Sequence, residues 1–312
     1  MKEIPADLAY STGIKTLDLS NNRIVRVPCE LCLLTALTSL NLDMNPLRPH
    51  VQDVVSRGLE ALMKYLRSLY SGAQTGKLDL VQQELRFYPD EIDPEWHITW
   101  LRLDDNKIRH LPRKMGHLTG LTVISVVGNQ LADLPDTLTS LTNLTSLLID
   151  SNELQELPFC VIHMKNLVEL SVTNNQLSSL PADGIGQLNK LTKIRVQGNP
   201  KLTHLPLTIG SMKNLRHIEF DPATVVSPDP QFQSDHATVT AYLQTLSDSM
   251  RTQSLDLSSR ELTVKYLCVL KYLTFGAKIS NELNKTGVSY GRAPPYRLDI
   301  SDDRSQQDPN AT

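Results

Sequence analysis

Leucine, asparagine and proline recur along this chain at a fixed interval. Three successive segments of 23 residues fit the pattern L-x-x-L-x-L-x-x-N-x-L-x-x-L-P, and they begin at Ile98, Leu121 and Leu144. Other copies, some partial and some with one added residue, begin at Ile14, Leu37, Gly76, Leu167 and Leu191. Together they extend from Ile14 to Asn214, and a sequence period of this length is typical of a solenoid of stacked turns.

Within each unit the apolar positions alternate, as in "LRLDDNKI", which predicts a short strand with one buried face. Strands of successive units placed side by side would form a parallel sheet with a continuous core. The asparagines would then stack where each strand ends, and their amides would donate to backbone carbonyls of neighbouring turns. These framework positions are Asn106, Asn129, Asn152, Asn175 and Asn199, with Pro112, Pro135, Pro158, Pro181 and Pro206 in the return stretches.

The repeat is interrupted twice by segments with helical periodicity. Apolar residues between Val51 and Tyr70 recur at helical spacing, with charged residues on the other side, and Gly72 follows as a stop. A second such segment contains Val239, Tyr242, Leu243, Leu246 and Met250. We interpret each helix as covering an apolar edge of the solenoid and closing a block of turns. The alternative is a long return on the convex side.

With these motifs the chain resembles intracellular leucine-rich-repeat proteins of the 23-residue "LxxLP" type, which are found in Ras-pathway scaffolds. It also resembles leucine-rich repeat-containing proteins with paired repeat blocks, which carry a similar "NP…G…YL" helix. The resemblance covers Ile14 to Phe220. It implies an α/β fold, a curved leucine-rich-repeat solenoid with a parallel sheet on the concave face and short helices or irregular returns on the convex face. The two amphipathic helices are insertions, and the implied role is binding of other proteins.

The same patterns divide the chain into segments. A main repeat block follows a shorter first block, and the pattern decays beyond Arg260. A polar, proline-containing end follows, for which we expect disorder. The predicted segments are 1–13, a first block 14–50, a closing helix 51–72, a main block 73–221, a closing segment and helix 222–250, degenerate repeats 251–283 and a tail 284–312.

Composition narrows the class of partner. The net charge of −3 and the pI near 6.2 give no electrostatic reason to expect nucleic-acid binding. Neither a signal peptide nor an apolar run that could cross a membrane is recognisable, so no membrane insertion is expected. The four cysteines, among them the isolated "CELC" of Cys29 and Cys32, favour reduced thiols and a cytoplasmic location over a zinc site. We therefore expect no metal and no cofactor.

No catalytic motif emerges. "GAQTGKL" superficially suggests a phosphate-binding loop, but it is one residue short and precedes a strand instead of following one. The eight histidines are scattered over different turns. We predict that the protein is not an enzyme and that it has no catalytic residues.

A partner is expected on the concave side, where the third, fifth and seventh positions of each unit should face solvent. Trp100, Val123, Val127 and Leu148 are apolar at such positions on three consecutive turns, as a protein-binding hot spot requires. The alternative is that Trp100 merely leans on the inserted helix. The predicted partner-binding residues are Trp100, Arg102, Asp104, Val123, Val127, Leu148, Asp150, Lys193 and Arg195.

Two functions remain open at this point. The first is a non-catalytic cytosolic scaffold or adaptor in signal transduction, binding a protein of unknown identity. The second is the recognition arm of a larger enzyme system, such as a ubiquitin ligase or a regulator of a GTPase or phosphatase. Extracellular pattern recognition would require a signal peptide and cysteine-rich caps.

Overall fold

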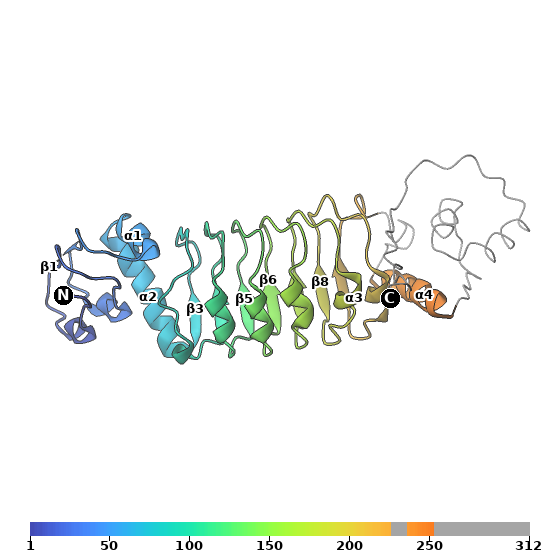
Figure 1. Ribbon diagram of the computed structural model, residues 1–312, viewed down its shortest axis with the longest axis horizontal. Helices are drawn as coiled ribbons and strands as arrows, with labels where there is room; N and C mark the ends of the chain where they lie inside the picture. The colour runs from blue at the N-terminus through green and yellow to red at the C-terminus, as the bar shows by residue number, and fades with distance from the viewer. Residues whose placement is uncertain (226–235, 253–312) are drawn as a thin grey trace, which may run out of the picture. The chain divides into compact units, whose positions relative to one another are not determined.

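The computed structural model describes residues 1–225 and 236–252 of the chain (Figure 1). By its internal contacts the chain divides into two units, Met1–Asp256 and Leu257–Thr312, and all described residues belong to the first. The tail predicted at 284–312 lies outside the described residues. So do the degenerate repeats predicted at 251–283, apart from residues 251 and 252, which end a helix.

The described strands form two parallel sheets, each with strands in sequence order. A two-stranded sheet pairs β1 (Thr16–Asp18) with β2 (Ser39–Asn41). The second sheet has seven strands. These are β3 (Lys77–Asp79), β4 (Trp100–Arg102), β5 (Val123–Ser125), β6 (Ser146–Leu148), β7 (Glu169–Ser171), β8 (Lys193–Arg195) and β9 (His217–Glu219).

Short helical returns connect the strands. Several of them begin directly after a repeat proline, whose fixed φ suits the start of a helix and which lacks the N–H that a strand ladder would need. The 3₁₀ helices are η1 (Ala6–Tyr10), η2 (Cys29–Leu33), η3 (Pro94–Trp96), η4 (Arg113–His117), η5 (Asp136–Ser140), η6 (Phe159–His163) and η7 (Leu207–Ser211), and α3 (Ala182–Ile185) serves as the return between β7 and β8. The sequence therefore correctly predicted a leucine-rich-repeat solenoid with a parallel sheet.

The asparagine ladder is confirmed by the hydrogen bonds. The Asn129 amide nitrogen donates to the Leu103 carbonyl of the preceding turn at 2.9 Å and to the Val126 carbonyl of its own turn at 3.1 Å. The Asn129 amide oxygen accepts from the Ile108 N–H at 3.0 Å. Asn152 repeats this pattern one turn later. Each buried asparagine thus connects two adjacent turns through backbone groups that the strands leave unpaired.

The first inserted segment differs from the single helix predicted at 51–72. It forms two helices, α1 (Pro49–Val55) and α2 (Leu59–Thr75), separated at Gly58, whose φ of 97° only glycine adopts readily. The predicted stop at Gly72 is also wrong. Gly72 is buried within α2, and the helix ends at Gly76, which has the left-handed φ of 68° common after a helix C-terminus.

Helix α2 lies between the two sheets in the chain order and in space, since it contacts η2 of the first block and β3 of the second (Figure 1). Within its apolar stripe, Leu62, Leu66 and Leu69 are at most 2 % exposed, whereas Leu59 and Tyr70 are partly exposed. Tyr65, which the helical pattern did not single out, is also buried. The role of α2 in closing a block stays a prediction.

The second inserted helix is α4 (His236–Thr252), which packs against η7. Val239, Tyr242, Leu243 and Leu246 are buried as their spacing predicted. In the main block the core consists of the repeat leucines and their equivalents, most of which are fully buried, between the sheet and the returns.

Candidate functional site

The outer face of the seven-stranded sheet, called the sheet face below, is formed by the first and third residues of each strand. In β4, β6 and β8 the central residue is buried while its two neighbours are partly exposed. This is the alternation of a short strand with one face in the core. The first residue of each strand is at least partly exposed, as the repeat predicted. The third residues of β5 and β7, Ser125 and Ser171, are buried, so the predicted exposure is wrong at these two positions.

The four predicted apolar residues lie on adjacent strands or directly after them. Trp100 of β4 is paired with Val123 of β5, and Leu148 of β6 is paired with Ser125. Trp100, Val123, Val127 and Leu148 are all partly exposed. The Arg102 guanidinium lies 5.5 Å from the centroid of the Trp100 ring, within the range of a cation–π contact. The same guanidinium is ion-paired with Asp104 at 3.0 Å and with Asp79 at 3.7 Å, so its charge is compensated within the sheet face. An aromatic, apolar cluster with an ion-paired edge results.

Asp104 and Asp150 connect turns and contribute less to the free surface than the sequence predicted. The Asp104 carboxylate accepts hydrogen bonds from the Ser125 hydroxyl at 2.5 Å and from the Val127 N–H at 3.0 Å. Asp150 accepts equivalent bonds from Ser171 and Thr173. Asp104 is 7 % exposed, so the solvent-facing position predicted for it is wrong. The reason is that the hydroxyl of Ser125, on the next strand, donates to this carboxylate, which therefore lies along the sheet and does not point into solvent.

Lys193 and Arg195 of β8 are surrounded by acidic residues on both sides. Arg195 lies 2.9 Å from Glu169 of β7 and 3.5 Å from Glu219 of β9. Lys193 lies 3.9 Å from each of the same two glutamates. The pair is therefore neutralised within the sheet face, and its positive charge is not free to attract an acidic partner.

A buried polar cluster, which sequence reasoning missed, joins the inserted helices to the second block. Glu91, in the loop after β3, accepts from the Tyr65 hydroxyl at 3.0 Å and lies 2.7 Å from His50 Nε2. The neighbouring Asp90 lies 2.7 Å from Lys114 and 3.4 Å from Arg48. These residues are far apart in the sequence, and the one available signal was an unusually polar loop beside an apolar helix.

The charges in this cluster have clear electrostatic effects. Burial raises the pKa of Glu91, but the hydrogen bonds from His50 and Tyr65 and the charge of His50 outweigh it, so the net pKa lies below its usual value. Burial, reinforced by the negative charge of Glu91, raises the pKa of Tyr65 well above its usual value. Glu91 is therefore ionised and Tyr65 is a neutral donor. The cluster ties the inserted helices to the second block and offers no exposed reactive group.

The thiols are not arranged for chemistry. Cys29, Cys32 and Cys160 are free, and burial together with the charge of Glu30 raises the pKa of Cys29 to about 12. Among the residues that the structure describes, no group of three or more metal-ligating side chains occurs. In the same part of the chain, no helix combines the length and apolarity that crossing a membrane requires.

Comparison with protein families identifies the repeats. The family model described as leucine rich repeat matches residues 97–154 and 142–200, and a second model of the same description matches residues 13–34. The matched residues include Trp100, Val123, Val127 and Leu148. The chain therefore contains leucine-rich repeats, and its fold is a leucine-rich-repeat solenoid.

Among solved structures, a leucine-rich-repeat protein of Leptospira interrogans is 24% identical, with a TM-score of 0.39, over 70% of this chain and 63% of that chain. The functional domain of InlJ from Listeria monocytogenes is 20% identical, with a TM-score of 0.43, over 70% and 46%. The ectodomain of the Arabidopsis thaliana receptor kinase GASSHO1/SCHENGEN3 is 25% identical, with a TM-score of 0.38, over 70% and 26%. This chain thus spans less than two thirds of each of these proteins.

Proposed function

We propose that the protein is a non-catalytic protein-interaction module that acts as a cytosolic scaffold or adaptor in signalling. The observation that carries this proposal is the cluster of Trp100, Val123, Val127 and Leu148 on the sheet face. Leucine-rich-repeat solenoids as a class use extended surfaces of this kind to bind proteins. The free cysteines support a reducing compartment, and the resemblance to Ras-pathway scaffolds supports a role in signalling.

The composition of the sheet face explains how a partner would be held. Trp100 and Leu148 offer apolar area that is partly exposed in the free protein, and covering it releases water. Arg102 lies beside the indole and is ion-paired with Asp79 and Asp104, so it packs against the edge of the cluster without adding free charge. The charges around β8 neutralise each other, so they would contribute to selectivity more than to attraction. Affinity would therefore depend on the apolar residues.

The proposal can be tested by affinity purification from cells followed by mass spectrometry. The wild-type protein is compared with the double variant Trp100→Ala/Leu148→Ala. We expect one or more proteins to be recovered with the wild type and lost with the variant. An enzyme recovered in constant stoichiometry would favour the recognition-arm function over the scaffold.

The matched control is His217→Ala, an exposed residue of β9 on the same sheet but outside the cluster. It should retain every partner that the wild type binds. Circular dichroism and the thermal unfolding midpoint establish that the double variant is folded. If the folded double variant retrieves the same proteins as the wild type, the sheet face is not the binding surface.

A further inference from the structure

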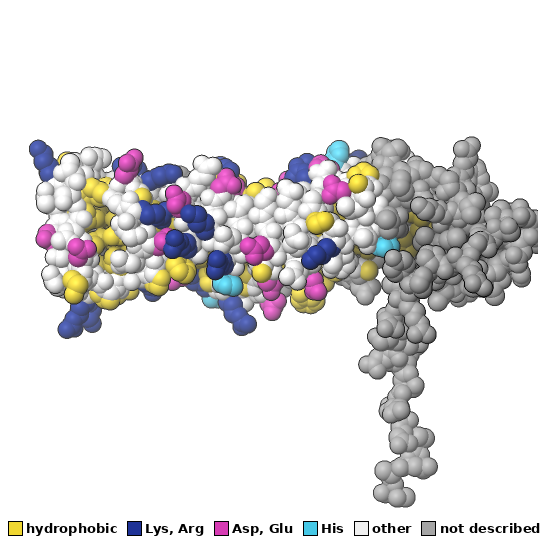
Figure 2. All heavy atoms as spheres, turned by 90° about the horizontal axis from the view of Figure 1, so that it is seen from above, with side chains coloured by type: hydrophobic (Ala, Val, Ile, Leu, Met, Phe, Trp, Pro, Cys, Tyr) yellow, Lys and Arg dark blue, Asp and Glu magenta, His cyan; other side chains and the backbone are white. Residues whose placement is uncertain are grey.

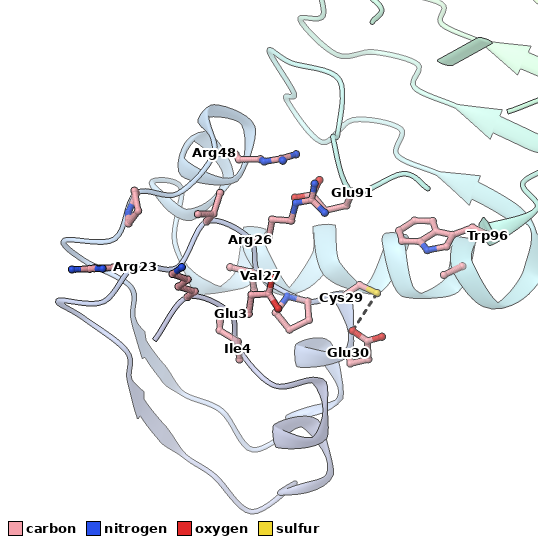
Figure 3. Close-up of a pocket in the computed structure, with 15 residues that line it drawn as sticks. Glu3, Ile4, Arg23, Arg26, Val27, Cys29, Glu30, Arg48, Glu91 and Trp96 are labelled. Carbon is pink, nitrogen blue, oxygen red and sulfur yellow. Dashed lines mark hydrogen bonds between the residues drawn. The ribbon is translucent and has the colours of Figure 1, made fainter. Parts of the chain in front are cut away.

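A groove of about 960 Å³ lies at the junction of the first block and the inserted helix α2 (Figure 3). One wall consists of residues 2–4 and the return segment after β1, residues 23–30. The opposite wall includes Ala73 of α2 and Trp96 of η3. The groove exists because α1 and α2 replace a short return and set the second block apart from the first. It is separate from the residues of the sheet face described above.

The groove offers apolar surface to solvent. Val25 is 39 % exposed, although its neighbours Ile24 and Val27 are buried in the core of the first block. Trp96 is partly exposed, and Figure 3 places its ring across the groove from Val27 and Cys29. Hydrophobic side chains also form a visible strip near the N-terminal end of the face in Figure 2. A partly exposed aromatic ring is suited to pack against an apolar side chain of a partner.

Positive charge remains uncompensated at the end of the groove away from Trp96. Arg23 and Arg26 are exposed, and neither forms an ion pair with any residue that the structure describes. Arg48, by contrast, lies 3.4 Å from Asp90. The indole of Trp96 and the side chain of Arg23 lie at opposite ends in Figure 3, so the apolar and the cationic parts are adjacent but distinct.

The acidic residues that line the groove do not fully cancel the positive charge of its arginines. Glu91 is hydrogen-bonded to His50 and Tyr65, and Glu30 accepts a hydrogen bond from the Cys29 thiol at 3.6 Å. The bond from a neutral thiol leaves the charge of Glu30 in place, so Glu3 and Glu30 stand against Lys2, Arg23 and Arg26. These three cations exceed the two carboxylates by one charge, and Arg23 and Arg26 keep no ion-pair partner among the described residues, although the whole chain carries a net charge of −3.

We propose that this groove is a second interaction surface, which binds an extended segment of a partner protein with acidic residues next to an apolar residue. The guanidinium groups of Arg23 and Arg26 can each hold a carboxylate through two parallel hydrogen bonds. The apolar side chain would pack against the partly exposed ring of Trp96. A concave groove lined from two sides accommodates a chain segment, whereas a flat bilayer surface cannot enter it. Since both blocks line the groove, the bound segment would also link them.

The chain contains two tryptophans, and they report separately on the two surfaces, because Trp96 lines the groove and Trp100 lies on the sheet face. The experiment selects peptides from a random peptide library on the immobilised Trp100→Phe protein. The double variant Arg23→Glu/Arg26→Glu, in the same background, serves for counter-selection. The enriched peptides are then synthesised with a fluorescein label and titrated.

We expect enriched peptides to contain acidic residues beside an apolar one. Binding should change the emission of Trp96 and should weaken about tenfold or more in Arg23→Glu/Arg26→Glu. The charge-matched control Arg113→Glu/Arg216→Glu alters exposed arginines elsewhere and should bind the peptides like its parent. The variant Trp100→Ala/Leu148→Ala, which tests the proposed function, should also retain this binding, so the two proposals fail independently.

Three outcomes would overturn the inference. The first is the absence of any sequence enriched over counter-selection. The second is enrichment of peptides whose acidic residues can be replaced by amides without loss of affinity. The third is binding of phosphatidylserine vesicles that depends on Arg23 and Arg26 in a protein that selects no peptide, which would assign the charge to a lipid surface.

Discussion

Replacement of Leu62 and Leu66 by alanine tests whether α2 holds the first block to the second. Both side chains are at most 2 % exposed, and they lie one turn apart on the face of α2 that is buried. Loss of a leucine side chain from a core costs about 2–5 kcal/mol. The two costs will not add fully, because the residues share neighbours. Even one of them is a large part of the stability of a small repeat block.

The structure indicates which region should respond. The first block contains a sheet of only two strands, and a two-stranded sheet is marginal in water unless it packs against a helix. The second sheet has seven strands with many interfaces of their own. We therefore expect the unfolding transition to split, with residues 1–50 losing protection before residues 98–220. Hydrogen exchange followed by mass spectrometry measures the protection of each segment.

The matched control is Glu60→Ala, which truncates an exposed residue of the same helix. It should exchange like the wild type. Two results would refute the reasoning. One is a Leu62→Ala/Leu66→Ala protein with wild-type exchange throughout. The other is uniform loss of protection in both sheets, which would mean that α2 does not separate two cooperative blocks.

Three further outcomes are expected. Asn152→Leu should lower the free energy of unfolding by about 1–3 kcal/mol in urea titrations, because it leaves buried backbone groups unpaired; an unchanged midpoint would contradict the ladder. Gly76→Ala should lower the thermal midpoint, since its φ of 68° is strained for alanine and the new methyl group would lie 3.1 Å from the His97 carbonyl oxygen; an equally stable variant would argue against that conformation. The folded pKa of Glu91 lies below its ordinary value, so its contribution to stability should be full above that ordinary value and decline as the pH falls toward the folded pKa. Urea titrations at several acidic pH values, on wild type and Glu91→Gln, should show that the variant lacks this part of the dependence of the unfolding free energy on pH. The same dependence in both proteins would show that Glu91 contributes nothing.

The strands and the ladder could be predicted because the information is local. A strand needs alternating residues, and each asparagine needs only the turn before it, so one period of the sequence contains the whole pattern. The break at Gly58 was missed for a related reason. Helical spacing of apolar residues continues across the glycine, and the pattern contains no information about φ.

The candidate site was predictable in position but not in pairing. Because Trp100 and Val123 occupy the same position in successive repeat units, the sequence placed them on neighbouring strands, which the register confirms. Equivalent positions of the neighbouring units also hold Glu169 and Glu219 beside Arg195, but the repeat pattern alone does not show that these charges pair and cancel. Whether Trp100 and its neighbours bind a partner stays a prediction.

The polar cluster around Glu91 could not be found in the same way. Its partners His50 and Tyr65 lie on the inserted helices, outside the repeat, so the repeat pattern does not relate them to the loop after β3. Tyr65 was not counted with the apolar stripe of its helix, although it is buried as deeply as the leucines. Contacts between a repeat and an insertion require the three-dimensional arrangement of both.

The strand register has a consequence for how such a chain can change in length. Trp100 pairs with Val123 and Val123 with Ser146, steps of 23 residues, while Glu169 pairs with Lys193 over 24. The extra residue is taken up outside the strands, where α3 replaces a 3₁₀ return. The backbone register is therefore the same from turn to turn, whereas the side-chain contacts are not. Excision of residues 121–143 would present Ser146 to Trp100 in the same register, but it would place Leu148 where Ser125 now donates to Asp104.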